Sequence, residues 1–145
     1  MALDTQVSQK IALAQLQDIT DASSRANLLP ATNGLGYVTG AGGAVTQITS
    51  ASTGVTLSKY CGQITTVALT TAAAAEEVFT VTNTLVDAND VVVVSTTYAG
   101  AGTIAVFTKK VAAGAFDIVI ANLHASAALD AVVVINFIVL KSVAS

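Results

Sequence analysis

The sequence predicts an all-β protein, an antiparallel β-sandwich of the jelly-roll-like type with about eight strands. Hydrophobic residues make up 53% of the 145 residues, but aromatic residues only 5%, and tryptophan is absent, so the apolar content rests on Ala and Val. Val, together with the abundant Thr, is β-branched and fits a pleated strand better than a helix. From Ala44 onward, short runs of such residues alternate with turn residues. Their spacing of roughly 8–14 residues is typical of a sandwich or barrel and leaves no room for crossover helices.

Eight runs are predicted to be strands. Four of them are followed by a break that contains Gly, Asn, Asp or Ser, the residues that turns favour. Such breaks are residues 52–54, 87–90, 100–102 and 113–114. The alanine-rich stretch 70–77 is more simply a loop than a helical turn. The predicted strands are 44–49, 54–58, 62–69, 76–84, 90–98, 103–111, 115–122 and 131–141.

Two of the runs, 91–94 and 132–135, are apolar at every position. In residues 78–82, by contrast, Phe79 and Val81 alternate with the other residues, as in a strand with one buried and one wet face. A strand that is apolar on both faces needs cover on its outer side, either from the N-terminal segment or from another subunit. We favour another subunit, because the chain has few other elements. The predicted subunit-interface residues are Val132, Val134, Asn136 and Ile138.

Asn136 stands in the middle of the last predicted strand. Its amide would be costly to bury without a hydrogen-bond partner. Two interpretations are open: the amide bonds neighbouring backbone groups, or the Asn136 side chains of several subunits form a ring on a symmetry axis.

Residues 1–33 differ from the predicted β-sandwich domain, residues 34–145, and we call them the N-terminal arm. Apolar residues recur there at helical spacing, and Asp4 or Thr5 can cap the start, so we expect an amphipathic helix over residues 4–19. An isolated helix of that length is marginal in water, so it must lie against its own domain or a neighbouring molecule. Residues 20–43 are expected to be an irregular linker. The arm residues expected to contact a partner are Leu3, Val7, Ile11 and Leu16.

The charge content restricts the classes of partner. Charged residues make up 10% of the chain, against roughly 25% in an average soluble domain, and the net charge is −3 at pH 7. Proteins that bind nucleic acid carry clustered Lys and Arg, whereas Lys109–Lys110 is the one basic pair here and fits a solvated hairpin end. A small domain with so few charges exposes large apolar patches, which usually mark interaction sites. We therefore expect an obligate oligomer or a component of a larger assembly, without nucleic acid.

The sequence indicates neither a membrane protein nor a secreted one. Its longest apolar stretch, residues 131–140, is interrupted by Asn136, and a spanning helix needs about 20 residues. The N-terminus has no basic start followed by an apolar run, so no signal peptide is expected. The single cysteine, Cys61, forms no intrachain disulfide, in agreement with synthesis in a reducing cytoplasm.

The glycine-rich stretch 34–43 raises the question of a phosphate-binding loop. A P-loop requires GxxxxGK[ST], but Ala41 stands where the second glycine belongs, and the first lysine after this stretch is Lys59. The dinucleotide fingerprint GxGxxG requires a third glycine where Thr39 stands. That fingerprint also lies between a strand and a helix, whereas the stretch here precedes predicted strands. We therefore interpret the glycines as a hinge between the arm and the β-domain, where they give backbone freedom and close chain approach.

The sequence also gives no support for a metal site or for a catalytic acid or base. One His and one Cys cannot supply the four ligands of a structural zinc site, and His124 has no GxSxG motif to accompany it. Asp87 and Asp90 could suggest a cation-binding loop, but a turn rich in Asp and Asn already explains them. Adjacent Glu76 and Glu77 would point to opposite faces of a strand. We expect no enzyme, no catalytic residue, no bound metal and no cofactor.

Four further segments follow one another along the chain: GYVTGAGGAVTQITSASTGVTLSKYCGQIT (36–65), FTVTNTLVDANDVVVVS (79–95), VAAGAFDIVIANL (111–123) and AVVVINFIVLKSVAS (131–145). Together they resemble a module found in virion proteins of tailed bacteriophages. The typical module reads GYxTGAGGxVTQxTSxxTGVTL, FxVxNS, a DxVxV strand, VAxGSF and a closing VINFxVIK. The resemblance runs from Gly36 to the C-terminus, with conservative departures at Thr84 and Ala115, and leaves the N-terminal arm outside.

The resemblance implies a structural virion protein. Such modules occur in head decoration (cement) proteins, which are typically small, β-rich, often trimeric, and grip the major capsid protein with an arm. It implies a homotrimer on the outer capsid surface that bridges capsid subunits and stabilises the head, made in the cytoplasm of a bacterial host. The alternative is a receptor- or glycan-binding tip of a tail or fibre protein, for which Tyr37, Tyr60 and Tyr98 are candidate contact residues.

Overall fold

The computed structural model describes residues 28–31, 34–37 and 40–142, in two units, Met1–Thr39 and Gly40–Ser145. The helix predicted over residues 4–19, and with it Leu3, Val7, Ile11 and Leu16, lies outside the described residues. Within the described part, every helix or strand element is a strand, which confirms the predicted all-β class.

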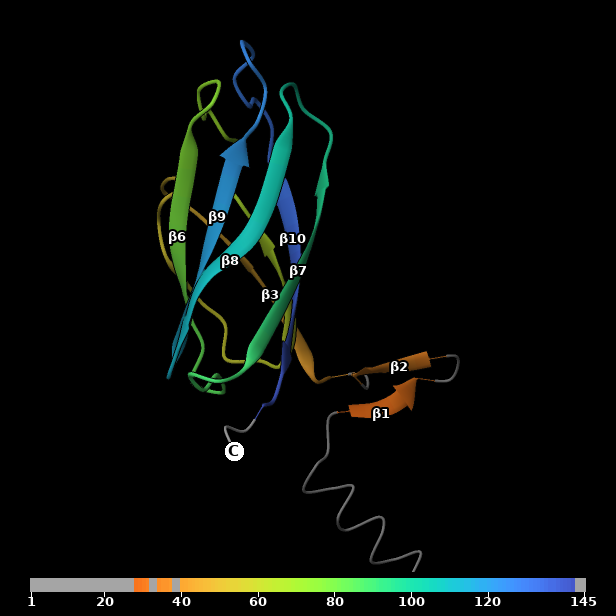
Figure 1. Ribbon diagram of the computed structural model, residues 1–145. Helices are drawn as coiled ribbons and strands as arrows, with labels where there is room; N and C mark the ends of the chain where they lie inside the picture. Colours follow the sequence, from red (N-terminus) through yellow and green to blue (C-terminus); the bar gives the residue numbers. More distant parts are fainter. Residues whose placement is uncertain (1–27, 32–33, 38–39, 143–145) are drawn as a thin grey trace, which may run out of the picture. The chain divides into compact units, whose positions relative to one another are not determined.

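The described part of the first unit is a β-hairpin. Strands β1 (Leu28–Ala31) and β2 (Gly34–Tyr37) pair antiparallel, with Ala31 opposite Gly34 and Leu28 opposite Tyr37 (Figure 1). These residues were expected to be an irregular linker, because Pro30, Asn33–Gly34 and several small polar residues are typical of loops. A proline lacks only the backbone N–H, and a two-stranded hairpin tolerates that loss at an open edge.

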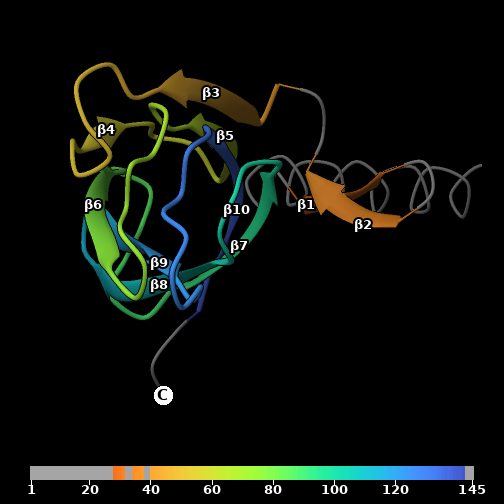
Figure 2. The same cartoon turned by 90° about the horizontal axis from the view of Figure 1, so that it is seen from above.

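The second unit is a β-sandwich of two four-stranded sheets (Figures 1 and 2). One sheet has the strand order β3-β5-β10-β7, and the other has the order β4-β6-β9-β8. The predicted sandwich of about eight strands is confirmed, and each predicted strand overlaps an observed one. The strands are β3 (Gly42–Thr46), β4 (Val55–Thr56), β5 (Cys61–Thr65), β6 (Glu76–Thr82), β7 (Val91–Tyr98), β8 (Ile104–Ala112), β9 (Ala115–Asn122) and β10 (Val133–Leu140).

Two neighbouring pairs of strands are parallel, in contrast to the expected antiparallel pairing. β3 runs parallel to β5, and β4 runs parallel to β6, whereas the other four pairings in the sandwich are antiparallel. The reason is the path of the chain, which crosses to the opposite sheet at each connection from β3 to β8. Because each crossing reverses direction, strands two apart in the sequence run the same way, and β3/β5 and β4/β6 are also neighbours in space.

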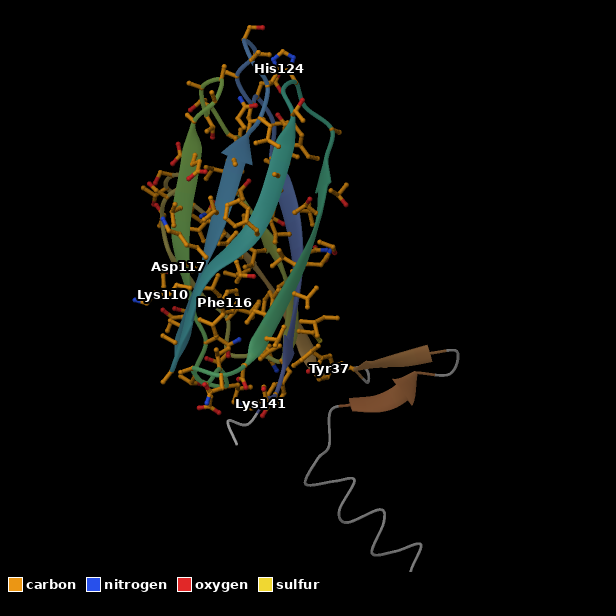
Figure 3. The ribbon with its side chains drawn as sticks, in the orientation of Figure 1. Tyr37, Lys110, Phe116, Asp117, His124 and Lys141 are labelled. Carbon is orange, nitrogen blue, oxygen red and sulfur yellow. The ribbon has the colours of Figure 1, made fainter. Side chains whose placement is uncertain are left out.

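The core lies between the sheets and consists of the inward rows of side chains. The Phe116 ring of β9 (labelled in Figure 3) meets the Phe137 ring of β10 across the interior, with a centroid separation of 5.4 Å and tilted planes. This geometry is one that aromatic pairs favour. Strand β6 contributes Phe79 and Val81, as its sequence alternation predicts. The largest fully buried side chains also include Ile64, Leu69, Ile118, Ile120, Leu129 and Ile135.

Two buried asparagines tie the loops to opposite ends of the sandwich. Asn83, just after β6, donates its amide to the Lys59 carbonyl at 2.7 Å and accepts the Leu85 N–H at 3.0 Å. Asn122, at the end of β9, donates to the carbonyls of Thr71, Ala72 and Ala127 at 2.8–3.2 Å and accepts the His124 N–H at 3.1 Å. Both side chains therefore supply hydrogen-bond partners to backbone groups of the neighbouring loops.

The glycine-rich stretch contributes to a strand as well as to a turn. Gly40 has φ +92°, a conformation that L side chains rarely adopt. Gly43 lies in β3, opposite Gly62 of β5, and the Leu57 side chain packs over both. A Cβ at Gly62 would come within 2.7 Å of Leu57, 2.8 Å of Phe137 and 3.0 Å of the Gly43 carbonyl oxygen. The expected hinge at residues 34–43 is thus, in part, a slot for the Leu57 side chain.

The substitution Gly62→Val tests this slot. Because the added side chain must displace Leu57 or Phe137 in a packed core, we expect the free energy of unfolding to fall by about 1–3 kcal/mol. Urea denaturation measures the change, with Thr82→Val as control, because Thr82 is an exposed strand residue and should change stability by less than about 0.5 kcal/mol. Equal stability of the two variants would contradict the packing described.

Candidate interaction surface

The side chains of β10 divide between the two faces of its sheet. Val133, Ile135, Phe137 and Val139 are fully buried in the core. The residues between them point away from the core, as the alternation of a strand requires. This outward row consists of Val134, Asn136, Ile138 and Leu140.

The outward row of β10 continues sideways onto β5 and β7. Ile138 is flanked by Cys61 and Val93, and Leu140 lies opposite Val91. Further along, Asn136 is flanked by Gln63 and Ser95, and Val134 by Thr65 and Thr97. The outer face therefore has two bands. We call one the apolar band (Cys61, Val91, Val93, Ile138 and Leu140) and the other the polar band (Gln63, Thr65, Ser95, Thr97 and Asn136).

The apolar band is open to solvent in the single chain. The exposed fraction is 52% for Val91, 51% for Val93, 41% for Ile138 and 42% for Leu140. Large aliphatic side chains that are half exposed and adjacent form a patch of the kind that marks an interaction site. This end of the sheet is the one at which β3 begins, since Gly42 lies opposite Cys61.

No charged residue occurs at the outward positions of β3, β5, β7 and β10. The outer face of the second sheet differs, because Glu76, Lys110 and Asp117 lie on it (Figure 3). That face also has an apolar row, in which Val119 is covered between Val78 and Phe107. The sparse charges of this chain are thus distributed unevenly, and one whole sheet face has none.

The structure brings together three of the four residues predicted for a subunit interface. Val134, Asn136 and Ile138 share the outer face, and Val132, with an exposed fraction of 47%, immediately precedes β10. The sequence interpretation expected another subunit to cover the run 91–94, but it did not name Val91, Val93, Leu140 or Cys61 as interface residues. The run 91–94 had been recognised as apolar on both faces, but its register against β10 could not be read from the sequence.

The amide of Asn136 has a side-chain partner. Its Oδ1 accepts a hydrogen bond from Gln63 Nε2 at 3.1 Å, across neighbouring strands on the exposed face. A bond to neighbouring backbone, one of the two open interpretations, is therefore not the arrangement seen here. The other interpretation, a ring of Asn136 side chains between subunits, stays a prediction.

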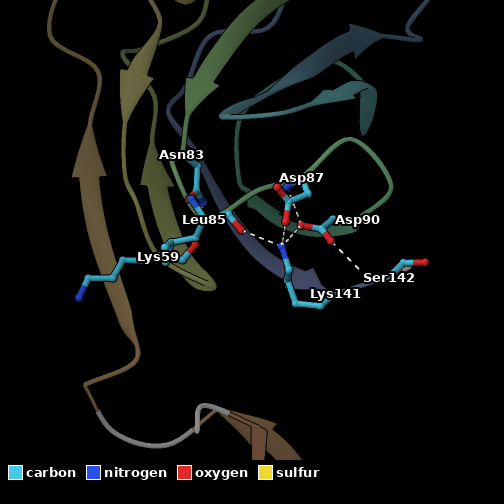
Figure 4. A network of polar contacts seen from close by, with 7 residues as sticks. All are labelled: Lys59, Asn83, Leu85, Asp87, Asp90, Lys141 and Ser142. Atoms are coloured by element: carbon cyan, nitrogen blue, oxygen red, sulfur yellow. Dashed lines mark hydrogen bonds and ion pairs between the residues drawn. The ribbon is translucent and has the colours of Figure 1, made fainter. Parts of the chain in front are cut away.

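Asp87 and Asp90, considered from the sequence as a cation-binding loop, surround a cation that the chain itself supplies. The Lys141 ammonium donates to Asp87 Oδ2 at 2.6 Å, to Asp90 Oδ2 at 2.7 Å and to the Leu85 carbonyl at 3.1 Å (Figure 4). Asp90 Oδ1 also accepts the Ser142 N–H at 3.2 Å. The network fastens the end of β10 to the turn that leads into β7, beside the apolar band.

The charges of this network stabilise one another. Burial by itself raises the pKa of Asp90, but hydrogen bonds from the Asp87 N–H, the Lys141 ammonium and the Ser142 N–H outweigh it and hold that pKa below its ordinary value. Hydrogen bonds to Asp87 and Asp90 raise the pKa of Lys141 above its ordinary value.

The thiol of Cys61, in the apolar band, is affected by burial. Burial raises its pKa, against a smaller opposing effect of Lys59.

His124 acts as a loop cap in this structure. It lies at the end of the sandwich opposite Lys141 (Figure 3). Its Nδ1 accepts the backbone N–H of Ser126 at 3.1 Å and of Ala127 at 2.8 Å. This nitrogen holds the loop after β9, which is a structural role.

The tyrosines considered for glycan contact serve the fold where their surroundings are described. The Tyr98 hydroxyl donates to the Ala101 carbonyl at 2.6 Å and accepts the Asp130 N–H at 3.0 Å, and Tyr60 packs against the core. A shallow hollow in the second unit has hydroxyl groups and a carboxylate in its lining, but no aromatic ring. Its polar lining residues are Thr49, Ser50, Ser52, Thr70 and Glu77.

Two searches of the described residues for other kinds of site were negative. No cluster of three or more His, Cys, Asp or Glu in residues 28–31, 34–37 and 40–142 is placed to hold a metal ion. In the same part of the chain, no helix is long and apolar enough to cross a membrane.

The chain matches no protein-family model, no curated protein and no solved structure. The outer face of the sheet β3-β5-β10-β7 is distinguished by its exposed apolar band and by the absence of charge at its outward positions.

The substitution Lys141→Met tests the ionic network. We expect it to lower the free energy of unfolding by about 1–2 kcal/mol at pH 7, because Asp90 loses its cation. The Asp90 contribution is present at neutral pH and is lost as the pH falls below about 4, through the depressed folded-state pKa. The Lys141 contribution is lost only as the pH rises beyond about 10. Urea denaturation should therefore show wild type and variant converging in acid.

The control for this prediction is Lys110→Met, which removes a lysine from the outer face of the second sheet. Its stability should differ little from wild type at any pH. A difference between wild type and Lys141→Met that stays constant from pH 7 to pH 3 would show that Asp90 and Lys141 do not interact in this way.

Proposed function

We propose that this protein is a structural component of the virion of a tailed bacteriophage, a decoration or cement protein that works as a homotrimer. In this role it lies on the outer capsid surface, bridges subunits of the major capsid protein and stabilises the head. The observation that carries the proposal is the charge-free outer face of the sheet β3-β5-β10-β7, because such a face on a small acidic domain calls for cover by protein. The resemblance of residues 36–145 to virion modules supplies the kind of assembly.

The proposed mechanism is mechanical. A homotrimer seated where capsid subunits meet adds contacts that must break before the shell opens. Each contact is weak, but the contributions of many copies add across the shell. This role needs no covalent chemistry, and it fits a domain in which Asn83, Asn122 and Lys141 fasten loops.

The arm is proposed to contact the shell. Leu3, Val7 and Ile11 recur at intervals of four residues and fall near one face of the expected helix, which suits a groove on a larger protein. Leu16 is the fourth proposed contact residue. The β-sandwich has a core of its own within residues 40–142. Truncation of the arm can therefore test whether the arm binds the shell while the sandwich forms the oligomer.

A receptor- or glycan-binding tip of a tail protein is the alternative. The hydroxyl-rich hollow beside Glu77 is the feature that favours it. Sugar sites generally add a flat aromatic surface, and the hollow has none. A glycan array probed with the purified protein separates this function from the decoration function.

Deletion of residues 2–33 tests the role of the arm. We expect a folded oligomer of the same subunit number that no longer binds expanded capsids, because the sandwich core is intact while the shell contact is lost. Co-sedimentation with purified capsid shells measures binding, and full-length protein is the positive control. Capsid binding by the deletion variant at full-length affinity would defeat this assignment.

The substitution Val93→Lys tests the role of the sheet face. A lysine in the centre of the apolar band would be buried without a partner if subunits meet there, so we expect the homotrimer to dissociate. Val78→Lys is the matched control, since Val78 is also a partly exposed valine on the outer face of a sheet. Size-exclusion chromatography reports the subunit number, and thermal unfolding confirms that both variants fold. An intact oligomer in Val93→Lys would count against the proposal.

A further inference from the structure

We infer, resting on the proposed homo-oligomer, that copies of this chain meet through the outer face of the sheet β3-β5-β10-β7 with their β10 strands pointing the same way. The symmetry axis then runs along the strands. The apolar band of each copy lies at the level of the apolar bands of the others, and the Asn136 side chains share a second level.

The charge distribution identifies a second copy as the occupant of the face. Each chain has a net charge of −3, so copies repel one another over most of their surface. The outward positions of β3, β5, β7 and β10 have no charge, which makes this face the place where identical chains can meet without opposing like charges. An acidic or basic partner would find no complementary group there.

The area of the face requires that both bands take part. Four strands at a spacing of about 4.8 Å, each about six residues long, present roughly 400 Å² in projection per copy. Three such faces around the axis of the homotrimer, with their side chains, bury about 1,500 Å² in total, above the lower limit of about 1,000 Å² for a specific interface. The apolar band alone covers about half of that and falls short.

The two bands then decide the orientation. Leu140 and Val134 stand six residues apart on β10, or about 20 Å along the strand. If the strands of two copies ran in opposite directions, Ile138 and Leu140 would face the Ser, Thr and amide groups of the polar band and leave them unpaired. With the strands running the same way, apolar meets apolar and amide meets amide.

The amide pair on each copy suits this arrangement. Asn136 and Gln63 use one donor and one acceptor on each other, at 3.1 Å. Each side-chain amide has two donor hydrogens and an acceptor oxygen with two lone pairs, so both keep groups for a neighbouring copy. Amides at one level around an axis can therefore complete each other's hydrogen bonds and fix the register of the copies.

Cysteine cross-linking tests the orientation in the full-length chain. In a Cys61→Ser background, Leu140→Cys and Val134→Cys are prepared separately and treated with a short bis-maleimide. We expect each variant to cross-link to its own copies, because equal levels meet. Cross-links that form only when the two variants are mixed would overturn the inference by showing opposite strand directions.

A control places one cysteine on the other sheet. Thr82→Cys in the same background lies on the outer face of the second sheet and should give no cross-link. Efficient cross-linking of Thr82→Cys, with none at positions 134 and 140, would show that copies meet through the outer face of the second sheet. That result would overturn the inference, although the protein would still be a homo-oligomer.

The native thiol gives a reading without new cysteines. Cys61 should react more slowly with a small thiol reagent in the wild-type oligomer than in the dissociated Val93→Lys variant. A wild-type chain that is monomeric would refute the proposed homo-oligomer itself. A monomer whose Cys61 becomes reactive on deletion of residues 2–33 would show that the chain's own N-terminal segment covers the face, and would refute the inference too.

Discussion

The pleat of β10 is the constraint on which the rest of the structure depends. A strand sends alternate side chains to opposite faces, and both rows of β10 are largely apolar. One row, with Phe137 at its centre, completes the core against Phe116 of the other sheet. The other row has no such place within the sandwich and stands on the outer face with Val91 and Val93. The same strand therefore stabilises the fold and creates the surface that calls for a partner.

Three polar side chains hold loops at the two ends of the sandwich. Asn83 and Asn122 form hydrogen bonds with backbone groups at opposite ends of the sandwich. Lys141 binds two carboxylates and a backbone carbonyl at the C-terminal end of β10. Some of the charged residues serve this network, and others lie on the sheet β4-β6-β9-β8. The outward positions of the sheet β3-β5-β10-β7 have no charged residue. Sparse charge and its uneven placement together leave one face for assembly.

Strand existence was predictable, whereas pairing was not. Val- and Thr-rich runs between turn residues located all eight sandwich strands, because local sequence decides where a pleated segment can form. Parallel pairing of β3 with β5 depends on how the chain crosses between sheets, which no local pattern records. The hairpin at residues 28–37 was hidden by Pro30 and its glycines. Asn122 and the ammonium of Lys141 act between segments about 50 residues apart, so their roles emerge only in three dimensions.

Oligomerisation is the central claim, because it would cover the exposed apolar band and because the proposed virion role requires it. Sedimentation equilibrium of the full-length chain, over a wide range of concentrations, tests it most directly. The account predicts one species of three times the 14.5 kDa chain mass that persists on dilution. A stable 14.5 kDa monomer at every concentration would contradict it.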